Sequence, residues 1–169
     1  FALAEEMVKI GKNAGRKTIA VISDMDQPLG RAVGNALEVK EAIATLRGEG
    51  PEDFKELCMV LGSRMLLAGS KAESVEEARN MLTNVIRDGS ALRSLLLGGG
   101  RETKESEIDL SVGILLEKKK GDAVKKGEVL GYLHANDEKR LEAAKEKFRS
   151  AYFITGHQPE AEPLIKGIL

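Results

Sequence analysis

The chain has a single cysteine, Cys58, among its 169 residues, so no disulfide can form within it. A chain without an internal disulfide is typical of a reducing compartment, and we expect the cytoplasm. Long apolar runs are also missing. Runs such as Leu95–Leu97 are far shorter than the roughly 20 residues that a membrane-spanning helix needs. We therefore expect no membrane partner.

The chain also lacks an excess of charge of one sign, because 26 Lys and Arg residues are balanced by 27 Asp and Glu residues. Nucleic-acid binding needs a basic surplus, so we expect no nucleic-acid partner. The hydrophobic share of 42% permits a core, and the length suits one domain or two small ones. The chain begins at Phe1 without Met or a signal-like segment, and we interpret it as a piece of a longer protein.

The most informative stretch runs from Lys17 to Leu46. Its apolar, β-branched residues 18–22 predict a strand buried on both faces. A polar break at 23–30 contains Pro28 and ends in glycine, and apolar residues at helical spacing then predict a helix from near Arg31. A strand, a polar loop and a helix in this order are where α/β proteins place ligands. The oxygen-rich loop suits a hard cation or a polar substrate.

Helical patterns dominate the rest of the first half. The sequence predicts helices over Ala2–Ala14, from Pro51 to Gly69, and after Ser74, which stands in capping-box position before Glu77. The helices that start near Arg31, Pro51 and Ser74 have wide apolar faces. We interpret them as a helical subdomain, a dimer interface, or both.

The second half reads as a smaller α+β unit. We expect strands at 112–116 and 132–136, a charged helix at 137–150, a last strand at 151–154 and an apolar tail at 164–169. Between the first two strands, residues 121–130 follow the pattern GDxVxKGExL. Its glycines suit tight turns, and its Val and Leu residues suit the core of a small sheet. The fold class is therefore α/β with α+β pieces.

The residues VISDMDQPLG (21–30) and AVGNALEVKEA (32–42) closely resemble the central signature of the thymidine and pyrimidine-nucleoside phosphorylases, and most of all the Firmicute pyrimidine-nucleoside phosphorylases. The GDxVxKGExL pattern resembles the C-terminal domain of the same family, and also the hairpin of biotinyl and lipoyl domains. We see no modifiable lysine at a hairpin tip and interpret this pattern as architecture. The resemblance assigns 1–97 to the central α/β and helical region and 98–169 to a C-terminal barrel-sandwich-like α+β domain.

The resemblance implies a function. The family catalyses reversible phosphorolysis, in which a pyrimidine nucleoside and phosphate give the free base and a pentose 1-phosphate, and its members are homodimers. The family also binds potassium. The ligands that carry over are the backbone carbonyls of Leu29 and Ala32 and the carboxylate of Glu41. Without the resemblance, Glu41 would be interpreted as a solvated helix residue and Leu29 as part of the core.

The sequence also departs from the family. The phosphate-binding loop, with its Lys and its His-Ser-Thr-Gly-Gly-type motif, has no match, and the base-recognising Arg, Ser and Lys are missing. A tract is skipped between Ala91 and Leu97. No catalytic or substrate-binding residue therefore maps onto this chain, and we expect it to be inactive alone. The alternatives are a non-catalytic dimerisation or binding module and a biotinyl- or lipoyl-like domain. The signature points away from a third, an anthranilate phosphoribosyltransferase-like enzyme.

Other candidate residues favour structural roles. Asp24 and Asp26 could be an acid–base pair, but turn formation and helix capping are favoured. We interpret His134 and His157 as polar edge residues. The remaining interpretations are a buried apolar role for Cys58, solvated hairpin faces for Lys118–Lys120 and Lys125–Lys126, and a backbone break for Gly98–Gly100 with Arg101.

Overall fold

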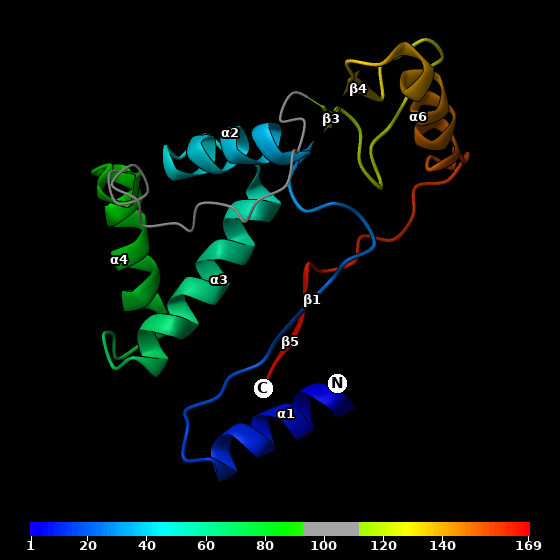
Figure 1. The fold of residues 1–169 in the computed structure, drawn as a ribbon. Helices are drawn as coiled ribbons and strands as arrows, with labels where there is room; N and C mark the ends of the chain where they lie inside the picture. The colour runs from blue at the N-terminus through cyan, green and yellow to red at the C-terminus, as the bar shows by residue number, and fades with distance from the viewer. Residues whose placement is uncertain (93–111) are drawn as a thin grey trace.

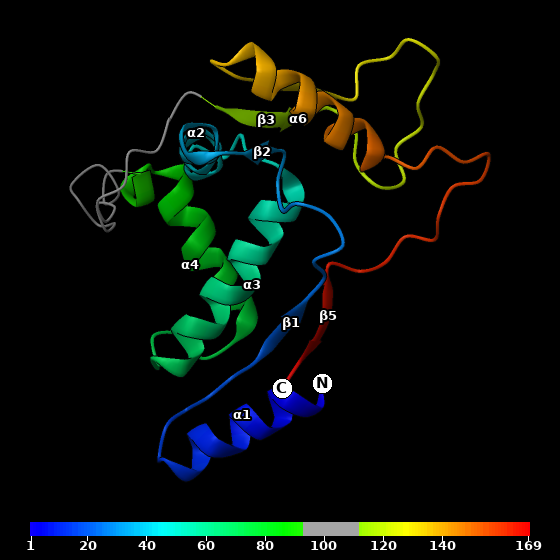
Figure 2. The ribbon, with the colours of Figure 1, turned by 45° about the vertical axis from the view of Figure 1, so that its right-hand side comes forward.

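Two small antiparallel sheets, each built from both halves of the sequence, organise the computed structural model, which describes residues 1–92 and 112–169. In one sheet, β1 (Val21–Ser23) pairs with β5 (Ile165–Ile168), with Ile22 opposite Gly167. Figures 1 and 2 show this two-stranded ribbon beside both chain termini. The last strand of the chain therefore lies against the first.

The second sheet has the order β2-β3-β4. Its strands are β2 (Ala32–Val33), β3 (Gly113–Leu116) and β4 (Gly131–His134), and Ala32 lies opposite Leu115. The backbones of β2 and β3 approach closely near Gly34 and Gly113. A Cβ on Gly113 would lie only 2.5 Å from the Val33 carbonyl oxygen, so this position has no room for a side chain. This sheet fixes the end of the 24–31 loop, since β2 follows that loop directly.

The described residues also form helices. They are α1 (Ala2–Asn13), α2 (Asn35–Leu46), α3 (Glu52–Ala68), α4 (Val75–Arg87) and α6 (Glu138–Ser150). These bounds confirm the expected helices to within a few residues. The capping box also holds, because the Ser74 hydroxyl accepts a hydrogen bond from the Glu77 amide at 3.1 Å.

Helices α3 and α4 pack along one another (Figures 1 and 2). Ala78 is fully buried between them, and Gly62 lets Leu82 approach, since a Cβ there would lie 2.9 Å from a Leu82 methyl carbon. A two-pronged ion pair between Arg79 and Glu56 closes the edge of this contact. The buried apolar residues of the described part are Val8, Ala32, Met59, Val60, Ala78 and Leu116.

Three expectations need correction. The β1 strand is half-buried in a two-stranded antiparallel ribbon rather than buried on both faces, because β5 is its one pairing partner among the residues that the structure describes. Residues 151–154 form no strand, and Phe153 is 90% exposed. The strand instead lies in the predicted apolar tail, where 165–168 finds the free edge of β1.

The proposed boundary at 97/98 falls outside the described residues. Each sheet nevertheless joins strands from before 92 and after 112, so the two parts are held together by backbone pairing. The described part combines helices with small antiparallel sheets, which agrees with the expected mixed α/β class. Among the described residues, none of the helices combines the length and apolar character needed to cross a bilayer.

Candidate functional site

The loop 24–31 connects β1 to β2 and turns sharply at Gly30. Gly30 has a φ of +68°, in the left-handed region that glycine adopts without a steric penalty. It is buried, whereas the loop residues 25–29 before it are exposed. The chain therefore enters the interior at Gly30 and continues directly into β2.

The backbone of Gly30 is held on both sides by an ion pair. Its amide donates to Oδ2 of Asp53 at 3.1 Å, and its carbonyl accepts from Nζ of Lys119 at 2.8 Å. Lys119 and Asp53 also bind each other directly. The other carboxylate oxygen of Asp53 accepts from the Phe54 amide at 2.9 Å, in the first turn of α3. One carboxylate thus links the loop, α3 and the C-terminal half.

This arrangement shifts the ionisation of Asp53. Partial burial would by itself raise its pKa, but hydrogen bonds from Lys119, Phe54 and Gly30 and the charge of Lys119 outweigh burial, and the pKa lies below the ordinary value of 3.8. Asp53 is therefore ionised at neutral pH and is a strong acceptor for the Gly30 amide.

Glu41 holds the next two residues of the chain. Its Oε1 accepts from the Arg31 amide at 2.9 Å and from the Ala32 amide at 3.2 Å. Its Oε2 lies against Gly30, where an added Cβ would be only 2.2 Å away. Glu41 is thus not a solvated helix residue. The signal in the sequence is its position in the second turn of α2, close in sequence to the loop.

The three residues predicted as potassium ligands line one hollow of about 380 Å³. Its lining residues are Pro28, Leu29, Ala32, Val33, Glu38, Glu41 and Phe54. Backbone carbonyls and carboxylates are the oxygen ligands that hard cations prefer. Since Leu29 and Ala32 line this hollow together with two carboxylates, the residues present fit a monovalent cation, and the cation site stays a prediction.

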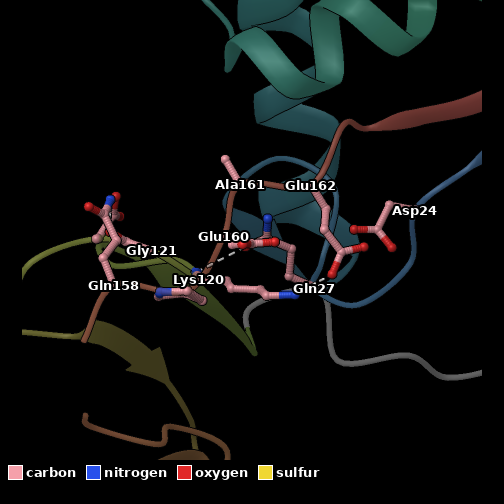
Figure 3. Close-up of a pocket in the computed structure, with 10 residues that line it drawn as sticks. Asp24, Gln27, Lys120, Gly121, Gln158, Glu160, Ala161 and Glu162 are labelled. Carbon is pink, nitrogen blue, oxygen red and sulfur yellow. Dashed lines mark hydrogen bonds and ion pairs between the residues drawn. The ribbon is translucent and has the colours of Figure 1, made fainter. Parts of the chain in front are cut away.

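A second hollow, of about 290 Å³, lies where the loop meets the segment before β5. Figure 3 shows Asp24 and Glu162 facing one another there, with Lys120 and Gln27 beside them. Carboxylate oxygens of Asp24, Asp26 and Glu162 lie within 4.8 Å of one another. Lys120 pairs with Asp26 at 3.3 Å and with Glu162 at 3.4 Å. Charge pairing between distant segments explains these carboxylates without acid–base chemistry.

The remaining candidates are placed as follows. His134 is exposed on β4 and His157 is exposed after α6, and neither belongs to the carboxylate cluster that is found among the described residues. The prediction of a buried Cys58 is wrong, because Cys58 is exposed on α3. Gly98–Gly100 and Arg101 lie outside the described residues.

Sequence reasoning missed Lys119 and Asp53. The prediction that Lys118–Lys120 form a solvated hairpin face is wrong for Lys119, whose side chain is only 13% exposed. A lysine within a run of lysines gives no local signal of its partner, which lies 66 residues earlier in the chain. Only tertiary structure brings these two residues to Gly30.

Comparison with known families covers both halves. Residues 1–92 match the family model described as the glycosyl transferase family, a/b domain. Residues 71–155 match the model described as the pyrimidine nucleoside phosphorylase C-terminal domain. The second match assigns the GDxVxKGExL pattern to a phosphorylase domain rather than to a biotinyl or lipoyl domain.

Individual relatives agree with this assignment. The chain is 44% identical to a pyrimidine-nucleoside phosphorylase of Geobacillus stearothermophilus, over 97% of this chain and 49% of that protein. It is 45% identical to one of Bacillus subtilis, over 80% of this chain and 43% of that protein. The chain thus spans about half the length of the curated relatives it matches. The first alignment extends over 214 residues, more than this chain contains, so the relative includes residues that this chain lacks.

Proposed function

Because this chain belongs to the pyrimidine-nucleoside phosphorylase family, we propose that it forms the cation-loop and C-terminal part of such an enzyme. The enzyme acts on a pyrimidine nucleoside and phosphate. A phosphate oxygen bonds to the anomeric carbon of the pentose, the bond from that carbon to the base breaks, and the base leaves with the electron pair and takes up the proton that the phosphate gives up. The products are the free base and a pentose 1-phosphate.

The observation that supports this proposal most is the hollow shared by Leu29, Ala32 and Glu41. These are the residues onto which the family resemblance places potassium ligands. A bound potassium ion supplies positive charge beside the loop, which favours an anionic substrate such as phosphate. The chain's own contribution is to hold the loop, since Glu41 fixes the amides of Arg31 and Ala32.

We further propose that the chain alone does not catalyse phosphorolysis. The family's phosphate loop and base-recognising residues have no match in it, so it can bind and orient only part of a substrate complex. Activity requires the other half of the enzyme, and the active assembly is a homodimer. A non-catalytic binding module remains the alternative, and it would show no activity in any combination.

The test measures phosphate-dependent release of uracil from uridine and of thymine from thymidine in potassium buffer. The chain alone is compared with the chain mixed with the separately produced N-terminal half of the Geobacillus relative. We expect no release by either half alone and potassium-dependent release by the mixture. A mixture that assembles but stays inactive would favour the binding module. Turnover by the chain alone would contradict the proposal that activity requires the other half of the enzyme.

A further inference from the structure

Lys119 reaches the cation loop from the far half of the chain. It lies after β3, in the part that matches the phosphorylase C-terminal model, whereas Gly30 and Asp53 lie in the part that matches the α/β model. Its Nζ sits between the Gly30 carbonyl oxygen, at 2.8 Å, and the Asp53 carboxylate. The contact therefore connects the two family segments at the loop itself.

Its two neighbours behave differently. Lys118 pairs with Glu128 of its own hairpin at 2.7 Å, and Lys120 pairs with acidic groups while remaining 38% exposed. The Lys119 side chain is 13% exposed, and that of Asp53 is 31% exposed. Lys119 is the least exposed of these three consecutive lysines, since the Lys118 side chain is 21% exposed, and it is the one directed at a backbone carbonyl of the loop.

Peptide geometry makes this contact relevant to the cation ligands. The Gly30 amide and the Leu29 carbonyl belong to one planar trans peptide unit, so they point in opposite directions. When Asp53 accepts the Gly30 amide, it turns the Leu29 carbonyl away from itself. The next peptide unit is held by Lys119 at the Gly30 carbonyl and by Glu41 at the Arg31 amide.

Both peptide units that flank the Gly30 Cα are thus fixed by charged side chains. The charges of Lys119 and Asp53 compensate each other, so the pair holds the loop without placing a net positive charge beside a cation site. We infer that the Lys119–Asp53 pair is a positioning device that orients the Leu29 carbonyl, and that the C-terminal segment thereby sets the cation affinity of the loop. The part of this inference that concerns affinity rests on the proposed function.

The test uses Lys119→Met, which keeps the length of the side chain and removes its charge. Lys118→Met is the matched control, since the ammonium group of this adjacent lysine contacts Glu128 and the Ala123 carbonyl, both within its own hairpin. The first readout is amide hydrogen exchange at Gly30, measured by NMR. Lys119→Met removes the charged partner of the Gly30 carbonyl and of Asp53, and we expect the loosened loop to show roughly 10- to 100-fold faster exchange at the Gly30 amide. The control should change exchange there by less than about threefold.

The second readout is binding of thallous ion, a spectroscopic substitute for potassium, to the same proteins. We expect weaker binding by Lys119→Met than by the unaltered chain and partial recovery in Lys119→Arg, which keeps the charge. Asp53→Asn keeps the side-chain shape and provides a second variant should Lys119→Met not fold. It should raise exchange at Gly30 in the same way.

The outcomes separate the two proposals. Unchanged Gly30 exchange in both Lys119→Met and Asp53→Asn would overturn the positioning role. Faster exchange with unchanged thallium affinity would overturn the link to cation affinity. Faster exchange in a chain whose unaltered form binds no thallium would support loop positioning and contradict the proposed cation site.

Discussion

Oε2 of Glu41 lies where a side chain at Gly30 would begin, 2.2 Å from the position of an added Cβ. Gly30→Ala should therefore disturb both the loop and the Glu41 carboxylate. Because the φ of +68° also disfavours alanine, we expect the unfolding free energy to fall by about 2 kcal/mol or more. Urea unfolding followed by circular dichroism measures this loss.

Gly15→Ala is the matched control for that substitution. Gly15 has a similar φ of +73°, but its Cβ would meet nothing within 4 Å. Gly15→Ala should therefore lower the free energy of unfolding only through backbone strain, by ~1 kcal/mol. Equal losses of unfolding free energy in the two variants would mean that the clash with Glu41 does not contribute to the loss at Gly30.

Glu41→Gln should separate the structural role of Glu41 from its charge. A glutamine oxygen can still accept from the Arg31 and Ala32 amides, so we expect stability to change by less than about 1 kcal/mol. Potassium affinity, measured as the rise in melting temperature with added potassium chloride over choline chloride, should fall at least tenfold. A stabilisation by potassium that survives in full would argue against Glu41 as a ligand.

The control here is Glu38→Gln, because Glu38 lines the same hollow and accepts from the Gly34 amide. We expect a smaller loss of potassium affinity than in Glu41→Gln, since the family resemblance assigns no ligand role to Glu38. The reverse order would move the proposed site toward Glu38.

The contact between α3 and α4 offers a comparison of packing with surface charge. Ala78 is fully buried there, so Ala78→Leu should destabilise the fold by about 1–3 kcal/mol through overpacking. The neighbouring Arg79→Met removes an ion pair whose side chains are 36% and 46% exposed, and should cost less than about 1 kcal/mol. Denaturant unfolding of both variants tests the order, which would be wrong if the Arg79 variant lost more.

The pH dependence of stability should contain a contribution from Asp53. Its pKa in the folded chain lies below 3.8, so the unfolded chain takes up the proton first as the pH falls. Asp53 therefore stabilises the fold above that value, and its contribution is lost as the pH falls through the folded-state pKa.

The measurement is the unfolding free energy of the chain and of Asp53→Asn between about pH 2.5 and pH 6. The difference between them should be constant above about pH 5 and shrink toward the acid end. A difference that is the same at every pH would show that the charge of Asp53 contributes nothing.

Local rules predicted a large part of this fold. Apolar spacing and capping residues such as Ser74 predicted helices α1, α3, α4 and α6. A helix forms its backbone hydrogen bonds within itself, so its position depends little on distant residues. The resemblance named Leu29, Ala32 and Glu41 together, and they share one hollow. The stretch 17–46 was informative because its loop and its carboxylate helix are adjacent in sequence.

Tertiary structure decided the rest, since it depends on partners that are distant in sequence. Residues 165–168 form a strand because they pair with the edge of β1. Residues 151–154 have no such pairing and form no strand. The ammonium group of Lys119 pairs with Asp53, which lies 66 residues earlier in the chain, and not with a residue near its own run of lysines. A strand needs a neighbour and a buried charge needs a counter-charge, and neither partner can be read from the residues beside them.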